Sequence, residues 1–400
     1  MIKYPVSESS FSEIRKGSYL YVDKTMYIYQ LVESGKYFFL SRPRRFGKSL
    51  LISTMENYFL ANRELFHGLA LDRLEPAKWT RYPVLRLDFS HRGYKQPGDL
   101  EKALSETLDR WEAEYSSPNP DDSPDGRLNR LLWEIFRRTG RQVVILVDEY
   151  DSPIVDVYGN KDLEMSNRQT LHDFYRVMKA NSDYLKFVFL TGVGKLKQLN
   201  VFSGFNNLAD ISLDTRYSAI CGITTEELLD NFHEGITDLA HEMELTFDQT
   251  LQKLKEQYDG YHFSKRLVDI YNPFSLVKAL YFRDISDYWF QSGTPTRLIN
   301  QFLSNDWSTP DLEGYTVSKS SLQSGDVLGK SLALACYYTG YLTIKSYDPQ
   351  RDRFTLGYPN GEVRRGFFKD LMEAVKGWDE NHTDNFVVWC NSGRSLGSDR

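Results

Sequence analysis

The sequence predicts an α/β fold in which helices cover a parallel sheet, and two observations favour this fold. Four short apolar runs have the length and composition of buried strands, and they lie at Tyr37–Leu40, Pro83–Phe89, Val143–Val147 and Phe187–Leu190. The segments between these runs show the apolar periodicity of helices. Strands that are apolar on both faces and alternate with helices form parallel sheets with helices on both sides.

The remaining elements follow from helical spacing and from turn residues. In the first half, helices are predicted at 50–59, Asp99–Tyr115, Arg127–Arg138 and Asn167–Ala180. After about residue 215 the strand signal weakens, and helices are predicted at Thr225–His233, Leu245–Tyr258 and Phe274–Phe282. Near the end, a helix, two strands and a helix are predicted at 331–340, 341–347, 353–358 and 363–375. This last order is typical of a winged helix.

Composition and charge exclude several classes of protein. A length of 400 residues exceeds one ordinary core and predicts two or three domains. Forty-nine basic and 55 acidic residues give a net charge of −6, which excludes a polycation that coats nucleic acid. No apolar run approaches the roughly 20 residues that cross a bilayer, and the first residues lack the apolar region of a secretory signal. We therefore expect a soluble, cytoplasmic protein without membrane association.

The three cysteines predict neither a disulfide framework nor a metal knuckle, because Cys221, Cys336 and Cys390 lie far apart in the chain. Cys221 and Cys336 are expected in the core.

The segment RPRRFGKS (residues 42–49) has the end of a phosphate-binding loop between a strand and a helix. Gly47 lets the backbone approach a phosphate, Lys48 reaches the β and γ phosphates, and Ser49 offers a hydroxyl to Mg²⁺. The predicted nucleotide-binding residues are Arg44, Arg45, Phe46, Gly47, Lys48, Ser49 and Leu50. The segment departs from GxxxxGK[ST] because Arg42 stands where the general motif has glycine, and Pro43 removes an amide from the loop.

Two carboxylates and a threonine follow neighbouring predicted strands. Asp148 and Glu149 end the run VVILV, at the sheet edge where ligands of open parallel sheets bind. Asp148 would hold Mg²⁺ through water, and Glu149 would orient or deprotonate the attacking water. Thr191, after the next strand, stands where AAA-like ATPases place a polar residue that senses the γ phosphate. Lys195 or Lys197 would face the phosphate as well, and the alternative is that both are solvated charges.

Ten strings carry a resemblance to a known family. They are YVDKT, SRPRRFGKSLL, YPVLRLDFS, VILVDEYDSPI, FVFLTGVGKL, FSGFNNLADISL, YDGYHFS, YNPFSL, TGYLTIKSYD and LGYPNGEVR. From about residue 5 to 370 the chain resembles the bacterial AAA-ATPase-like family, which is related to the AAA+ and STAND ATPases and shares the departure at Arg42. The resemblance implies a P-loop NTPase fold and ATP binding through Lys48, Ser49, Asp148 and Glu149.

Under this interpretation the chain divides into four parts. We expect an AAA-like P-loop ATPase core over 1–215, a helical lid over 216–310, a winged-helix-like unit over 311–375 and a polar tail over 376–400. Many family members end in a PD-(D/E)XK nuclease-like domain, whereas the sequence after residue 370 offers one strand-like run, Phe386–Cys390, without a Glu-x-Lys. We therefore expect no nuclease activity of this chain's own.

Three functions remain open from the sequence. The first is an ATPase that couples its nucleotide state to movement of domains or of an unidentified protein partner. The second is a nucleotide-gated switch with negligible turnover. The third is DNA binding through the winged unit, which rests on Lys345, Arg351, Arg353, Arg364 and Arg365.

Three further hypotheses concern residues near the nucleotide. Arg216 would serve as a finger supplied by a neighbouring subunit of a homo-oligomer, and Arg44 and Arg45 would brace phosphates. The segment Tyr21–Lys24 would lie near the adenine, by analogy with the family.

Overall fold

The computed structural model describes residues 2–75, 79–115, 123–195, 208–289, 298–299, 312–324 and 331–374. The chain forms two compact units. The sheet unit comprises Ser7–Cys221 with 324–328, and the helical unit comprises Met1–Val6, Gly222–Gln323 and Gly329–Arg400. None of the helices in the described ranges is long and apolar enough to cross a membrane.

A five-stranded parallel sheet forms the centre of the sheet unit. Its strands are β1 (Tyr37–Ser41), β2 (Val84–Asp88), β3 (Val143–Asp148), β4 (Leu185–Gly192) and β5 (Ala209–Asp210), in the order β2-β3-β4-β1-β5. The four strands predicted from apolar runs are confirmed, and β1 and β3 are buried along their whole length. The fifth strand was missed because its two residues are exposed and carry no apolar signal.

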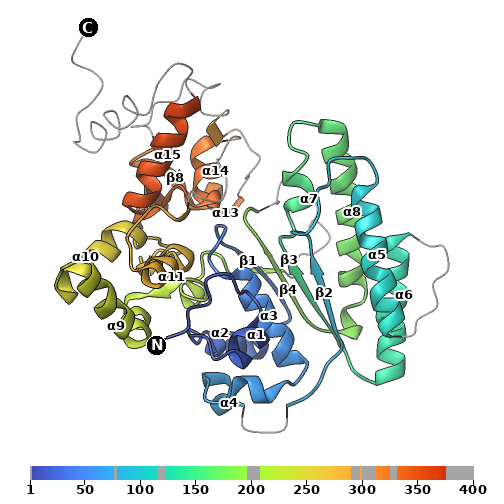
Figure 1. Cartoon of the computed structure of the whole chain (residues 1–400). Coiled ribbons are helices and arrows are strands. Elements are labelled where there is room, and N and C mark those ends of the chain that lie inside the picture. Colours follow the sequence, from blue (N-terminus) through green and yellow to red (C-terminus); the bar gives the residue numbers. More distant parts are fainter. Residues whose placement is uncertain are drawn as a thin grey trace. The chain divides into compact units, whose positions relative to one another are not determined.

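Helices cover both faces of this sheet (Figure 1). They are α1 (Phe11–Lys16), α2 (Thr25–Ser34), α3 (Lys48–Phe59), α4 (Ala70–Leu74), α5 (Asp99–Glu114), α6 (Pro124–Thr139), α7 (Ser152–Val155) and α8 (Lys161–Ala180). In Figure 1, α3 lies on one face, and α5, α6 and α8 form the layer on the other. Helix α8 begins six residues earlier than Asn167, because the Asn160 side chain caps the amide of Leu163.

The helical unit contains two groups of elements. The first comprises α9 (Thr225–Glu242), α10 (Phe247–Tyr258), α11 (Pro273–Phe282) and the short pair β6 (Ile223–Thr224) and β7 (Ile270–Tyr271). The second comprises β8 (Tyr315–Ser318), α13 (Lys319–Ser324), α14 (Leu332–Thr339), β9 (Thr343–Asp348), β10 (Arg353–Gly357) and α15 (Gly361–Ala374). The two strands predicted at 341–347 and 353–358 pair as β9 and β10, and β8 adds an unpredicted third strand in the antiparallel order β8-β10-β9.

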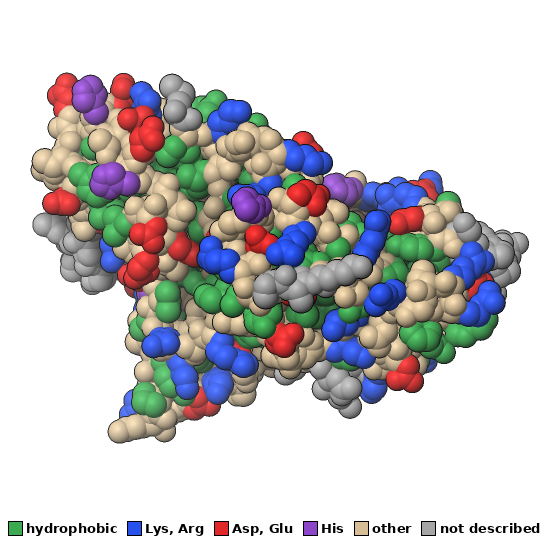
Figure 2. Space-filling view, turned by 90° about the horizontal axis from the view of Figure 1, so that it is seen from below, with side chains coloured by type: hydrophobic (Ala, Val, Ile, Leu, Met, Phe, Trp, Pro, Cys, Tyr) green, Lys and Arg blue, Asp and Glu red, His purple; other side chains and the backbone are tan. Residues whose placement is uncertain are grey.

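The basic residues on which predicted DNA binding depends do not form one exposed row. The Lys345 ammonium is partly buried and donates to the Pro359 carbonyl at 3.2 Å. The Arg365 guanidinium is hydrogen-bonded to Asp287 at 2.8 Å. Arg351 and Arg353 are exposed, and Arg351 lies 3.9 Å from the carboxylate of Asp348. On the face of the molecule that Figure 2 shows, acidic and basic side chains are interspersed.

Cys221 and Cys336 are both buried, as predicted for core residues. Burial raises the pKa of both thiols.

The motif YDGYHF (residues 258–263) begins at the end of α10 and lies against the residues that follow β10 within the helical unit. Gly260 has a φ of +86°, and a Cβ on it would lie 2.3 Å from the carbonyl oxygen of Pro359. The Asn360 side chain donates to the Asp259 carbonyl at 2.8 Å, beside this contact. The glycine is therefore required by both backbone conformation and space.

Gly260→Ala is expected to destabilise the helical unit more than Gly314→Ala does. Both glycines have a positive φ, but a Cβ on Gly314 would meet no atom within 4 Å. Both variants place an alanine at a positive φ, and this cost is common to them. The difference between their free energies of unfolding, about 1 to 3 kcal/mol, therefore measures the clash with Pro359. Calorimetric thermal unfolding of the full chain would measure it. Equal stability of the two variants would contradict the close approach.

Candidate functional site

The predicted phosphate loop (residues 42–49, called the phosphate loop below) joins β1 to α3 at the carboxyl edge of the sheet. Gly47 caps the amino end of α3 with a φ of +89°, and Arg45 also has a positive φ, at 68°. The left-handed backbone at Gly47 turns the chain into the helix, whose first amides carry no intrahelical partner. The Lys48 side chain is buried, and its Nζ donates to the carbonyls of Arg42 and Pro43 at 3.1 and 3.0 Å. The lysine is therefore held inside the loop.

Arg42 is a structural member of this loop. Its side chain is 1% exposed, and its guanidinium donates to the carbonyl oxygens of Ser41 (2.8 Å), Ser212 (2.9 Å) and Tyr217 (3.0 Å). These contacts tie the start of the loop to the segment after β5. The general motif has glycine at this position. Here Arg42 has a structural role instead, because its three hydrogen bonds fix the start of the loop.

The other predicted loop residues differ in exposure. Arg44 is exposed, Arg45 is half-buried, and Phe46 is 1% exposed in the core beneath the loop. Burial, and then the neighbouring Arg44, lower the pKa of Arg45. Ser49 and Leu50 follow in the first turn of α3 and are half-buried.

Asp148 is the last residue of β3 and is almost fully buried. Its Oδ1 accepts from the Thr191 hydroxyl at 2.6 Å and from the Glu149 amide at 3.1 Å. Its Oδ2 is buried and accepts no hydrogen bond from the part of the chain that the structure describes. A buried carboxylate oxygen without a donor fits a cation or a water bound to one, so the residues present are compatible with Mg²⁺.

Glu149 and Thr191 both donate a hydrogen bond to the Asp148 carboxylate. Glu149 has a φ of 49°, is half-buried, and accepts from the Ser152 hydroxyl at 3.1 Å. Thr191 is fully buried in β4, where it pairs in register with Leu40 of β1. The structure thus brings Asp148, Thr191 and the end of β1 to one edge of three neighbouring strands.

Asp151 is a further buried acid near this edge that the sequence analysis did not single out. Its carboxylate accepts from the amides of Gly194 at 2.8 Å and Val193 at 3.2 Å. Burial raises the pKa of Asp151 to about 6, against the lowering effect of these backbone hydrogen bonds. The signal was present as the third acid of VDEYDSP, but an acid before proline is equally typical of a turn.

Lys195 is buried, so the alternative that it is a solvated charge is wrong. Its side chain is 4% exposed, and its Nζ lies 2.5 Å from an Asp210 carboxylate oxygen of β5. The sequence could not show this pair, because the two residues meet only through the sheet. Lys197 lies outside the described residues.

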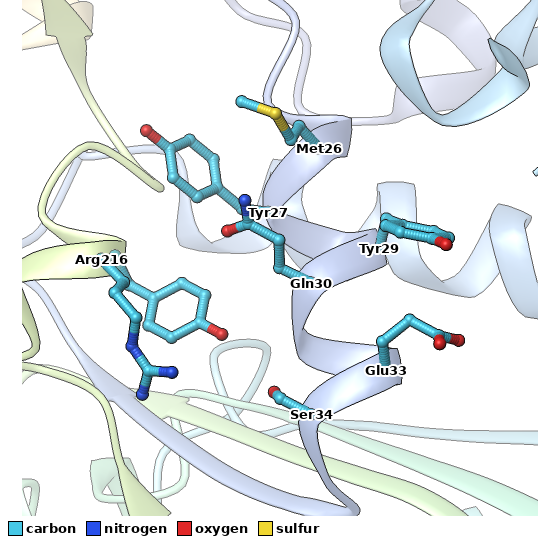
Figure 3. A pocket seen from close by; sticks show the side chains of 8 residues that line it. Met26, Tyr27, Tyr29, Gln30, Glu33, Ser34 and Arg216 are labelled. Atoms are coloured by element: carbon cyan, nitrogen blue, oxygen red, sulfur yellow. The ribbon is translucent and has the colours of Figure 1, made fainter. Parts of the chain in front are cut away.

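A pocket of about 620 Å³ runs along α2 beside the turn that contains Arg216. Its lining comprises Met26, Tyr27, Tyr29, Gln30, Glu33, Ser34, Arg216 and Tyr217. Figure 3 shows Tyr27, Gln30 and Ser34 projecting from α2 toward the side on which Arg216 lies. The Arg216 guanidinium is paired with Asp214 at 2.6 Å, and the Tyr217 carbonyl accepts from Arg42 of the phosphate loop.

The segment Tyr21–Lys24 makes contacts that explain it structurally. The Tyr21 hydroxyl lies 3.4 Å from that of Thr54, and the Asp23 carboxylate accepts from the amides of Thr25 (2.9 Å) and Ala70 (2.7 Å). Asp23 therefore ties α2 to α4. A place near the adenine stays a prediction for this segment.

Comparisons with known proteins agree with this architecture. A family model described as predicted AAA-ATPase matches residues 5–202, which contain the phosphate loop, Asp148 and Thr191. The chain is also 35% identical over 375 residues to an uncharacterized protein in the vnfD 5′ region of Azotobacter chroococcum mcd 1. That match covers 92% of this chain and 70% of the relative. The chain therefore belongs to the predicted AAA-ATPase-like family.

Proposed function

We propose that the sheet unit binds ATP with Mg²⁺ at the phosphate loop, hydrolyses it, and couples the nucleotide state to movement of the helical unit or of a protein partner. The observation that carries the proposal is the buried pair of Thr191 and Asp148, 2.6 Å apart, at the same sheet edge as the Lys48 loop. Family membership supports nucleotide binding at this edge.

Each residue of the site has a role that its chemistry permits. Lys48 would exchange the carbonyls of Arg42 and Pro43 for phosphate oxygens, since an ammonium binds an anion more strongly than neutral carbonyls. Ser49 and Asp148 would hold Mg²⁺, which when bound neutralises charge on the phosphates. Thr191 fixes the orientation of the Asp148 carboxylate through its hydroxyl. Glu149 would turn from Ser152 to orient the attacking water.

Asp148→Asn and Glu149→Gln are expected to separate binding from turnover. Asp148→Asn removes a charge from the cation ligand and should weaken Mg²⁺-dependent ATP binding. Glu149→Gln keeps the shape of the side chain but removes the base, so it should bind ATP normally and lose hydrolysis by roughly 100-fold or more. A phosphate-release assay and an ATP titration would measure both. Wild-type turnover in both variants would place the chemistry elsewhere.

A nucleotide-gated switch with negligible turnover is the second candidate. The contact between Glu149 and Ser152 favours it, because it holds one oxygen of the carboxylate at Ser152, whereas the proposed turnover requires Glu149 to turn away from Ser152. Phosphate release that is equally slow in wild type and Glu149→Gln, with tight ATP binding in both, would support the switch.

The second half of the chain would respond to the nucleotide bound by the first half. A helical lid over 216–310 and a winged-helix-like unit over 311–375 would respond to the nucleotide, and Arg216 would reach a neighbouring subunit. DNA binding by the winged unit loses support from the partial burial of Lys345 and the hydrogen bonds of Arg365. The predicted tail 376–400, with Phe386–Cys390, lies outside the described residues.

A further inference from the structure

The segment Gly192–Lys195, which follows β4, is held by buried polar groups from two other parts of the sheet unit. From the loop after β3, the Asp151 carboxylate accepts from the amides of Val193 and Gly194, and the Tyr150 hydroxyl donates to the Gly194 carbonyl at 2.8 Å. The loop after β3 therefore holds the segment through one carboxylate and one hydroxyl.

The end of β1 and the first residue of the phosphate loop hold the same segment. The Ser41 hydroxyl donates to the Val193 carbonyl at 2.5 Å, and the Arg42 amide donates to the Gly192 carbonyl at 3.2 Å. Ser41 and Arg42 directly precede the residues that would contact phosphate. A shift of the phosphate loop therefore acts on the segment through two hydrogen bonds.

The two ends of the segment have different partners. At the start, Thr191 donates to Asp148, the proposed Mg²⁺ ligand. At the end, Lys195 is paired with Asp210 of β5, the edge strand of the sheet. The segment thus connects the carboxylates of the site to the edge of the sheet.

The contact with Asp151 leaves little room for rearrangement. A Cβ on Gly192 would lie 2.4 Å from Asp151 Oδ1 and 2.6 Å from the Tyr150 ring, so the chain passes directly over the carboxylate. A carboxylate accepts from both amides, whereas an asparagine of the same shape offers one acceptor oxygen and one donor group. Oδ2 of Asp151 accepts from both amides, and Oδ1 lies 3.3 Å from the Val193 nitrogen. An asparagine would therefore lose the charge and set its NH₂ group against at least one of these amide donors, without a change of volume.

We propose that Asp151 is a positioning residue that couples the nucleotide at the phosphate loop to the segment Gly192–Lys195, and thereby sets the rate of hydrolysis and not the affinity for ATP. The proposal rests on the proposed function of the site. In this proposal Asp151 acts through its hydrogen bonds to Val193 and Gly194, which follow Thr191 in the chain, and not through contact with the nucleotide. Its loss displaces Thr191, and Asp148 with it, from the arrangement that turnover requires.

The test compares Asp151→Asn with Asp173→Asn. Asp173 is an acid on α8 whose carboxylate accepts from Gln169 at 2.7 Å, away from the site, so it controls for loss of a charge. We expect Asp151→Asn to bind MgATP within about threefold of wild type and to reduce kcat by roughly tenfold or more, because small displacements at a reacting centre are costly. Amide hydrogen exchange of a peptide containing 191–195 should become faster in Asp151→Asn only.

The outcomes distinguish the inference from the proposed function. Wild-type kcat in Asp151→Asn would overturn the inference while the ATPase assignment stands. Loss of ATP binding together with turnover would also overturn it, since Asp151 would then support the fold of the whole site. If the wild type binds ATP without hydrolysing it, the ATPase assignment fails. Protection of 191–195 by MgATP in wild type but not in Asp151→Asn would then support the coupling, and equal protection would overturn it.

Discussion

Lys48→Ala is expected to abolish the rise in melting temperature that MgATP produces in the wild type. A ligand that binds only the folded state stabilises it by about 2.7 kcal/mol at a concentration 100 times its Kd. For a unit of this size the stabilisation corresponds to a rise of roughly 5 to 10 °C. Lys48 Nζ lies within 3.1 Å of two loop carbonyls, so the ammonium already stands inside the loop that would hold the phosphates. Thermal unfolding with and without MgATP measures the rise.

The control for this variant is Lys179→Ala, at the exposed end of α8. It removes the same charge far from the loop in sequence and should keep the full rise. Because Lys48→Ala also removes two internal hydrogen bonds, the comparison uses the ligand-dependent shift and not the melting temperature itself. A full shift in Lys48→Ala would show that the phosphate loop is assigned wrongly.

Arg42→Gly is expected to destabilise the sheet unit, although it restores the glycine of the general phosphate-loop motif. The substitution removes a buried guanidinium and its hydrogen bonds to three carbonyl oxygens, those of Ser41, Ser212 and Tyr217. Hydrogen bonds to a charged group contribute about 1.5 to 3 kcal/mol each and are not additive, so we expect a loss of roughly 3 to 5 kcal/mol. Calorimetric unfolding of the full chain would measure the loss.

Arg44→Gly provides the matched control two residues further along the same loop. Arg44 is exposed, and the substitution changes the charge and the chain entropy of the unfolded state in the same way. It should cost about 1 kcal/mol or less. Equal effects of the two substitutions would mean that the guanidinium of Arg42 is not the anchor of the loop.

Local signals were sufficient for the elements that depend on neighbouring residues. The strands β1 to β4 appear as apolar runs because both of their faces are buried, and Gly47-Lys48-Ser49 marks the loop because the backbone turns there. Asp148 and Thr191 could be placed near each other, since parallel strands end at the same edge of a sheet. The start of α8 was harder to predict. Asn160 caps this helix, but an asparagine before a polar first turn is equally typical of a loop.

The sequence by itself determined the α/β fold, its four main strands, and the residue types at the edge of the sheet, because each of these depends on local periodicity and local turn chemistry. Only the tertiary structure decided the hydrogen bonds of Arg42, the pairing of Lys195 with Asp210 and the contacts of Asp151. Apart from the bond between Arg42 and its neighbour Ser41, these pairs are 15 to 175 residues apart in the chain. A buried charge is recognisable only by its partner, and the order β3-β4-β1-β5 is what brings the partners together.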